Sequence, residues 1–216
     1  MADKQKLHPA EADSPHLEIE LKVALLNKAE EKEVKKRLKG LKFKRERSSL
    51  IIDFIQPNAV DTKRIRLETS LHPVAGSNVT CVLGNKSHPI AGALSDFVRR
   101  ESENTVNAED ALRALAGAML SNDGEPVPYY TKRRHYFRGN VGGYEMCVSL
   151  DKPRGLLRRF SKRYLEVEVQ LPESSNKAAS AAAVKAVNEF VEKLTGRKPQ
   201  PEPSYRRMVR ETWDSR

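Results

Sequence analysis

The feature that most constrains the fold is a two-residue alternation of charged and apolar side chains, which recurs along most of the chain. EIELK at residues 18–22 is the first example, and YLEVEVQL at residues 164–171 repeats the pattern near the other end. Successive side chains of a β-strand point to opposite faces, so each segment has one charged face and one apolar face. The sequence therefore predicts a sheet with one strongly charged surface.

Eight segments have the alternation of strands, and three have the spacing of amphipathic helices. The predicted strands are residues 17–26, 48–57, 62–70, 78–86, 97–106, 129–138, 144–151 and 164–171. The predicted helices are residues 28–40, 108–120 and 177–195. Most links between strands are too short for parallel crossovers, which favours an antiparallel sheet with added helices.

The direction of the charged faces follows from the helices. If the apolar strand faces pointed inward, the three amphipathic helices would have no apolar surface to cover. If they pointed outward, the helices would cover part of them and the charges would line a central tunnel. Crowded charges in a lumen are costly unless they are compensated. Mutual ion pairs supply part of the compensation, and a divalent metal on the carboxylates with a polyphosphate on the cations would supply it better.

Both charge signs occur on the predicted tunnel face. The acidic side chains are Glu18, Glu20, Glu101, Glu103, Asp151, Glu166 and Glu168. The basic side chains are Lys22, Arg64, Arg66, Lys86, Arg99, Lys132 and Arg134. Clustered carboxylate oxygens suit Mg²⁺ or Mn²⁺ better than zinc. Fixed lysines and arginines beside such a metal are the equipment of phosphoryl transfer.

Composition agrees with an anionic ligand. The chain has 216 residues, with 39 Lys and Arg against 29 Asp and Glu, and a net charge of +10. This length suits one sizeable domain, and a basic balance favours polyanionic partners. The two cysteines, Cys81 and Cys147, form neither a disulfide framework nor a zinc motif, so we expect reduced thiols in a cytosolic-type compartment.

The N-terminal residues 1–15 are polar and contain two prolines, and we expect a disordered tail before a single domain at residues 16–213. They lack the apolar region of a signal peptide, and no run approaches the length of a membrane span. The expected location is cytoplasmic, with no membrane partner.

Six short motifs carry a resemblance to a known family. They are EIELK, RIR, RRESE, KRR, SLD and EVEVQ, which follow one another between residues 18 and 170 with matching strand parity. This pattern resembles the CYTH, or triphosphate tunnel metalloenzyme, superfamily. The resemblance implies a mainly β (α+β) fold, a closed eight-stranded antiparallel β-barrel with flanking helices. It also implies binding of triphosphate-bearing substrates with Mg²⁺ or Mn²⁺ in the tunnel.

The resemblance also implies roles for residues. Glu18, Glu20, Glu166 and Glu168 would carry the metal. Glu101, Glu103 and Asp151 would hold a second metal or its water shell. Lys22, Arg64, Arg66, Lys86, Arg99, Lys132 and Arg134 would grip phosphate oxygens. A second metal, or a lysine such as Lys22, would orient or deprotonate the attacking water. Lys22 and Glu168 are the expected catalytic residues.

Some positions depart from the family pattern. Asp53, in IIDFIQP, matches an acidic position of the second strand without the usual aromatic pair. Lys86 follows LGN rather than a smooth strand, and residues 87–98 resemble a local insertion. Arg99 competes with Arg100 for one site, and parity with the acidic residues that follow favours Arg99.

The expected function is a metal-dependent triphosphatase that acts on tripolyphosphate, a nucleoside triphosphate or an RNA 5′ end. Two other functions remain open at this point. One is a class IV adenylyl cyclase, in which the same clamp holds ATP. The other is a module that binds polyphosphate or RNA without turnover. Two basic runs, residues 35–47 and 152–163, are either solvated or patches for RNA or long polyphosphate. Tyr205 and Trp213 lie in a basic tail that we expect to pack on the barrel.

Overall fold

The computed structural model describes residues 16–56, 62–71, 79–86, 98–121, 124, 127–154 and 162–213. The tail predicted at residues 1–15 lies outside the described residues. So do the insertion at residues 87–97 and part of the second basic run.

The described chain forms eight strands and four helices. The strands are β1 (His16–Leu25), β2 (Lys44–Ile55), β3 (Thr62–Ser70), β4 (Thr80–Lys86), β5 (Val98–Val106), β6 (Tyr129–Val141), β7 (Tyr144–Arg154) and β8 (Arg163–Pro172). The helices are α1 (Lys28–Gly40), α2 (Ala108–Leu120), α3 (Lys177–Thr195) and α4 (Tyr205–Trp213). None of these helices is long and apolar enough to cross a membrane.

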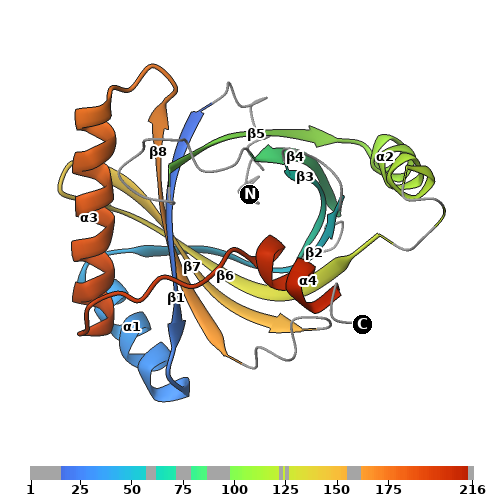
Figure 1. The fold of residues 1–216 in the computed structure, drawn as a ribbon. Helices are drawn as coiled ribbons and strands as arrows, with labels where there is room; N and C mark the ends of the chain where they lie inside the picture. Colours follow the sequence, from blue (N-terminus) through green and yellow to red (C-terminus); the bar gives the residue numbers. More distant parts are fainter. Residues whose placement is uncertain are drawn as a thin grey trace, which may run out of the picture.

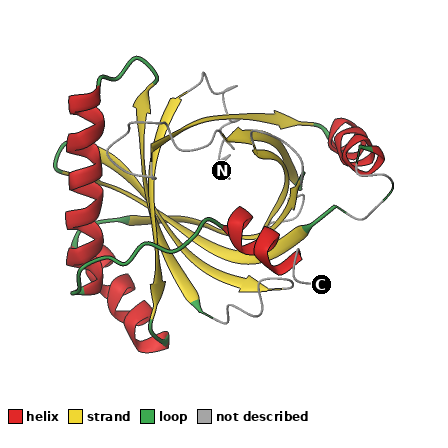
Figure 2. Cartoon of the chain, in the orientation of Figure 1, coloured by secondary structure: helices red, strands yellow, loops and turns green. Residues whose placement is uncertain are grey.

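The strands close into one barrel in the order β1-β5-β4-β3-β2-β6-β7-β8. Every neighbouring pair is antiparallel. Figure 1 shows the ring of strands with α1 and α3 on one side and α2 on the opposite side. Figure 2 shows that these three helices lie outside the ring. The predicted closed antiparallel barrel with flanking helices is confirmed.

The helices cover the outward apolar faces of the strands. Ile19 and Val167 of β1 and β8 pack with Val187 of α3 in one buried cluster. Ile65 of β3 packs with Ala111 of α2 in another. The apolar strand faces therefore point outward, as the amphipathic helices predicted, and the charged faces point into the barrel.

Local sequence signals set the helix ends. The side chains of Asn27, Asn107 and Asn176 each accept a hydrogen bond from a backbone N–H in the first turn of a helix. Gly196 ends α3 in the left-handed conformation, with φ of 74°. These caps lie within a residue or so of the predicted boundaries.

Four strands, β2, β6, β7 and β8, are longer than the sequence predicted. β2 begins at Lys44, so the basic run at residues 35–47 is divided between α1 and β2. β6 extends to a two-residue turn at Gly142 and Gly143, where φ is 58° and 84°, and β7 extends at its other end to Arg154. Glycine adopts positive φ without steric cost, which lets the ladder run up to the turn.

The three predicted helices are confirmed, and a fourth helix that the sequence analysis did not predict forms near the C-terminus. α4 has only nine residues, and its sequence YRRMVRETW is mostly polar or charged. Its buried residues, Tyr205, Met208, Val209 and Thr212, follow the spacing of one helical face. Packing against the barrel, rather than helix propensity, stabilises so short a segment.

The segment between α3 and α4, residues 196–204, lies along the edge of β1. We call it the strap. Pro201 bridges to Val23, and the N–H of Glu202 donates to the carbonyl of Lys22 at 2.8 Å. Arg197 donates to the carbonyl of Ala24 at 2.5 Å. The strap therefore fixes the end of β1 and leads the chain to α4.

Candidate functional site

The barrel encloses a cavity of about 200 Å³. Most of the residues predicted for the tunnel face line it. These are Glu18, Glu20, Lys22, Arg64, Arg66, Arg99, Glu101, Glu103, Lys132, Arg134, Glu166 and Glu168. The alternation of the strands therefore brings together side chains that are far apart in the sequence.

Two predicted site residues are placed differently. Asp151 is completely buried and is not among the described residues that line the cavity. Lys86 ends β4, where its backbone pairs with Thr62 and Glu101. The side chain of Lys86 lies outside the described part of the structure.

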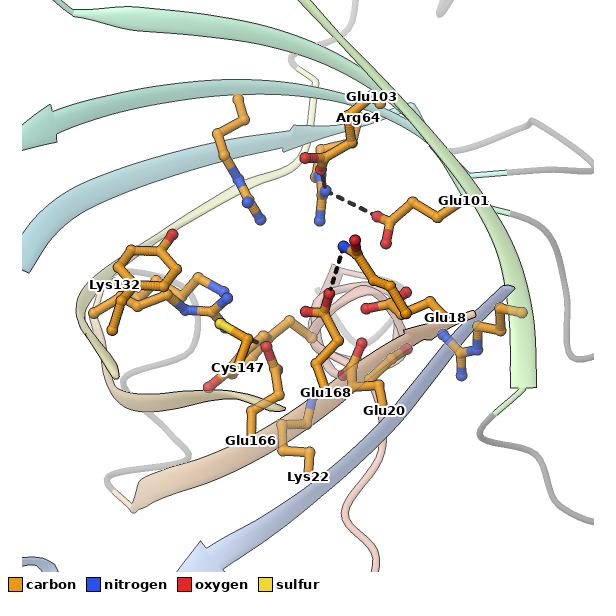
Figure 3. Close-up of a pocket in the computed structure, with 18 of the residues that line it drawn as sticks. Glu18, Glu20, Lys22, Arg64, Glu101, Glu103, Lys132, Cys147, Glu166 and Glu168 are labelled. Atoms are coloured by element: carbon orange, nitrogen blue, oxygen red, sulfur yellow. Dashed lines mark hydrogen bonds and ion pairs between the residues drawn. The ribbon is translucent and has the colours of Figure 1, made fainter. Parts of the chain in front are cut away.

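One wall of the cavity carries carboxylates from two adjacent strands. Figure 3 shows Glu18, Glu20, Glu166 and Glu168 on β1 and β8, on the side of the cavity across from Arg64. In the register of the two strands, Glu20 lies opposite Glu168. Glu168 accepts a hydrogen bond from Gln170 at 2.9 Å. The four carboxylates supply oxygen ligands, which are the ligands that Mg²⁺ and Mn²⁺ prefer.

The carboxylates are not gathered tightly around one point. Within the described chain, no group of three or more Asp, Glu, His or Cys side chains is close enough to hold a metal ion as the structure stands. A metal on this wall would therefore need small side-chain movements or ligands from a bound phosphate. Both are usual for Mg²⁺, which keeps water or phosphate oxygens among its ligands.

The opposite wall contains an arginine held by two carboxylates. Nη2 of Arg64 donates to Oε1 of Glu101 at 3.1 Å and also pairs with Glu103. Gly84 of β4 lies beside this cluster, where a Cβ would be in van der Waals contact with Arg64 at 3.4 Å. β4 thus has no side chain at this position of the cavity lining.

A buried ion pair fixes Arg66. Nε and Nη2 of Arg66 donate to the two oxygens of Asp53 at 2.7 and 3.2 Å. Burial alone would raise the pKa of Asp53, but Arg66, Arg64 and Lys132 hold it well below its usual range. Asp53 is therefore ionised and positions an arginine at the cavity wall.

A second buried network fixes Arg134. Its guanidinium donates to the two oxygens of Asp151 at 2.7 and 2.5 Å and to Glu166 at 2.6 Å. Nζ of Lys132 lies 3.3 Å from Asp151. Burial would raise the pKa of Asp151, but Arg134 and Lys132 lower it to about 2. Asp151 thus contacts Arg134 and Lys132 and is not among the described residues that line the cavity.

Lys22 is a buried cation whose ammonium group faces an aromatic ring. Its Nζ has no hydrogen-bond acceptor within the described residues and lies 3.8 Å from the centre of the Tyr205 ring. Burial lowers the pKa of Lys22 to about 8, although Glu20 and Glu166 act in the opposite direction. An ammonium group that faces a cavity without an acceptor is suited to a phosphate oxygen.

Sequence reasoning missed several lining residues. They are His16, Glu46, Arg47, Ile55, Gly84, Tyr130, Tyr136, Arg138, Cys147, Gln170, Ser204, Tyr205 and Arg206. Tyr130, Tyr136 and Gln170 share the parity of the predicted charges, so alternation would have found them if polar and aromatic residues had been counted. Burial is the main cause that raises the pKa of Cys147 to about 12, and the charge of Glu168 adds to it. The thiol therefore stays protonated and is a poor metal ligand.

The structure also distinguishes Arg99 from Arg100 and places two further glutamates that have the parity of the tunnel face. Arg99 lines the cavity and lies opposite Glu18 in the register, whereas Arg100 is exposed and pairs with Glu173 at 3.1 Å. Glu68 and Glu145 also have tunnel parity, and each forms an ion pair with an arginine, Arg47 and Arg138 respectively. Lys22 and Tyr205 mark one end of the cavity, which α4 covers.

No family model matches the chain, and no curated protein matches its sequence. Solved structures do share its fold. HpAC1 from Hippeastrum, an adenylyl cyclase candidate described as having a dominant triphosphatase activity, aligns with a TM-score of 0.55 and 17% identity over 92% of this chain and 96% of its own. An adenylate cyclase candidate from Bacillus halodurans aligns with a TM-score of 0.53 and 13% identity over 89% and 97%.

A third structure, the RNA triphosphatase Pct1 of S. pombe, aligns with a TM-score of 0.43 and 12% identity over 88% of this chain and 87% of its own. That likeness is too weak to support an argument. The first two define the class: the chain is a closed eight-stranded barrel with a charged interior. It has the fold of the triphosphate tunnel proteins, as the six motifs predicted.

Proposed function

We propose that this protein is a metal-dependent triphosphatase that hydrolyses the terminal phosphoanhydride bond of a triphosphate inside the barrel. One observation carries the proposal. The carboxylates of β1 and β8 line the same small cavity as several lysines and arginines. Oxygen donors for a divalent metal and cations for a polyphosphate are the two parts that phosphoryl transfer requires.

The residues on the carboxylate wall fit Mg²⁺ or Mn²⁺. Glu18, Glu20, Glu166 and Glu168 would hold the ion, which when bound polarises phosphate oxygens and offsets the charge that develops on them. Glu101, Glu103 and Asp151 would serve a second metal or its water shell only after release from Arg64 and Arg134. Their present contacts support a role in positioning these arginines.

The basic residues would bind the phosphate chain. Lys22, Arg64, Arg66, Lys86, Arg99, Lys132 and Arg134 are the proposed phosphate ligands. Arg66 and Arg134 are already fixed by carboxylates, so little side-chain entropy is lost when they bind phosphate. Burial lowers the pKa of Lys22 to about 8, so the charged ammonium form can orient a water molecule and the neutral amine form can accept its proton. Lys22 and Glu168 are the proposed catalytic residues.

The aromatic residues of the cavity favour a short inorganic polyphosphate over a bound adenine ring. Each lining tyrosine has a cation over its ring: Arg47 lies 4.2 Å from the centre of Tyr136, Lys132 lies 5.8 Å from that of Tyr130, and Lys22 covers Tyr205. In the described lining, these rings therefore contact cationic side chains of the protein, which disfavours stacking of a nucleobase on them. A nucleotide or an RNA 5′ end would have to leave its base outside the cavity.

One panel of assays tests the function. Purified protein is incubated with tripolyphosphate, ATP, thiamine triphosphate or triphosphate-ended RNA in Mg²⁺ or Mn²⁺, and phosphate, pyrophosphate and cyclic AMP are measured. Release of phosphate, fastest from tripolyphosphate, supports the proposal. Pyrophosphate with cyclic AMP from ATP would identify a cyclase instead. Tight binding without any product would identify a binding module.

A further inference from the structure

We propose that Tyr205 of α4 is a positioning residue that completes the phosphate site and fixes how far a phosphate chain enters the barrel. The proposal rests on the proposed function and deepens it. It concerns a helix that the alternation of the strands does not predict, and a residue that belongs to no strand.

α4 covers one end of the barrel. Met208 and Val209 pack with Ile55, Tyr130 and Tyr164 in a buried cluster. These partners lie where β2 ends and where β6 and β8 begin, and Figure 1 shows α4 across that end of the ring. Tyr205, at the first turn of α4, is only 4% exposed and lines the cavity.

The hydroxyl of Tyr205 supports an arginine through a carboxylate. It donates to Oδ2 of Asp151 at 2.9 Å, and the same oxygen accepts from Arg134 at 2.5 Å. Burial and the nearby Asp151 raise the pKa of Tyr205 well above its usual value, so the hydroxyl stays protonated and remains a donor. Loss of this donor would remove one of the three groups of the described chain that contact Oδ2 of Asp151 and loosen the buried network that holds Arg134.

The ring of Tyr205 supports two lysines directly. Nζ of Lys22 lies 3.8 Å from the ring centre, and Nζ of Lys132 lies 4.5 Å from it. Cation–π attraction is strongest where the cation is desolvated, and both lysines are buried. One aromatic ring thus holds the two ammonium groups together at the covered end of the cavity.

The same segment of the chain also fixes the backbone of Lys22. The N–H of Glu202 in the strap donates to the carbonyl of Lys22 at 2.8 Å, three residues before Tyr205. Lys22 is therefore held at its carbonyl by the strap and at its ammonium group by α4. Movement of α4 would therefore also displace the ammonium group of Lys22, a proposed catalytic group.

A limit on the substrate follows from this geometry. With Tyr205 across one end, a phosphate chain enters from the other end, and its terminal phosphate stops at Lys22 and Lys132. The terminal bond is then the one beside the carboxylates of β1 and β8. Without the ring, the chain can slide further, and an internal bond can reach the same position.

Linear tetrapolyphosphate distinguishes these positions. Water added to the terminal bond gives tripolyphosphate and phosphate, whereas water added to the central bond gives two pyrophosphates. We expect the wild-type protein to give almost only phosphate and tripolyphosphate as initial products, measured by ³¹P NMR. Tyr205→Leu should release pyrophosphate as a substantial initial product and raise KM for tripolyphosphate roughly tenfold, as expected for loss of a buried cation–π contact.

Tyr205→Phe separates the hydroxyl from the ring. It should keep the initial products of the wild type, because the ring remains, while kcat/KM falls severalfold through Arg134. Tyr129→Leu is the matched control, since Tyr129 is 48% exposed and is not among the described residues that line the cavity. It should leave kinetics and products unchanged.

The outcomes decide the proposal. If Tyr205→Leu folds and keeps wild-type KM and products, Tyr205 does not set the depth. If Tyr205→Leu does not fold, Tyr205→Phe decides alone, and unchanged kcat/KM overturns the proposal. If the wild type hydrolyses no polyphosphate, the proposed function fails, but calorimetric binding of tripolyphosphate still tests the role of Tyr205. We then expect weaker binding by the Tyr205 variants than by the wild type. Equal binding would refute the role of Tyr205.

Discussion

Replacing Glu168 with glutamine separates a metal-binding carboxylate from an ordinary charged strand residue. Glutamine keeps the size and one acceptor oxygen but removes the negative charge that a divalent ion needs. If Glu168 binds the metal, kcat for tripolyphosphate should fall on the order of 10²-fold or more, which corresponds to roughly 2.7 kcal/mol of barrier height. Phosphate release under saturating Mg²⁺ measures this directly.

The same substitution should not destabilise the fold. Glu168 lies directly opposite Glu20 across the β1–β8 ladder. Like charges in this position cost about 0.2–1 kcal/mol, so Glu168→Gln should leave the free energy of unfolding unchanged or raise it by that amount. Urea denaturation in the presence of chelator gives the comparison without a metal contribution.

The neighbouring residue supplies a control of opposite sign. Val167 is 0% exposed and packs in the outer cluster under α3. Val167→Asp places a charge there, and an unpaired buried carboxylate costs several kcal/mol, a large part of the stability of a domain. The reasoning is refuted if Glu168→Gln keeps the wild-type rate while Val167→Asp remains folded, because the two strand faces would then be assigned the wrong way round.

Three further predictions concern acid, packing and metal. The pKa of Asp53 is lowered in the folded state, so its stabilising effect is present above its unfolded pKa of about 4 and is lost as pH falls further. The melting temperature measured against pH should show this decline. Asp53→Asn should flatten the decline and should also destabilise the protein at neutral pH, because Arg66 loses its partner. Gly139→Ala should cost about 1–3 kcal/mol in urea denaturation, because a Cβ would lie 2.6 Å from Phe43, whose ring stacks on Phe190. Excess chelator should abolish phosphate release and Ca²⁺ should restore it poorly, since its looser geometry misplaces the phosphate; full activity in chelator would exclude a metal mechanism.

Much of the fold was predictable because parity is a strong local signal. One strand face lines the cavity and the other packs under helices, so a single alternating pattern specified both the barrel and most of its lining. The same parity chose Arg99 over Arg100. α4 was not predictable in this way, since nine mostly polar residues form a helix only because one face meets the barrel end.

The pairing of charges was not predictable, because it depends on register between distant strands. Arg64 of β3 reaches Glu101 and Glu103 of β5 past Gly84 of the strand between them. Asp151 faces inward as its parity requires, yet Arg134, Lys132 and Tyr205 surround it. The sequence indicates which side chains enter the barrel but not which partners they meet there.

The closure of the barrel has a consequence for how the chain folds. β1 pairs with β8 along its whole length, from His16 opposite Pro172 to Leu25 opposite Arg163, but with β5 only from His16 to Ile19. The main partner of the first strand is therefore made more than a hundred residues later. Such non-local pairing slows folding, because the loop must close before any contact repays the lost entropy. During synthesis, the apolar face of β1 therefore stays uncovered until β8 and α3 have been made. A ribosome-bound chain that stops before residue 163 should have an open barrel and should depend on chaperones.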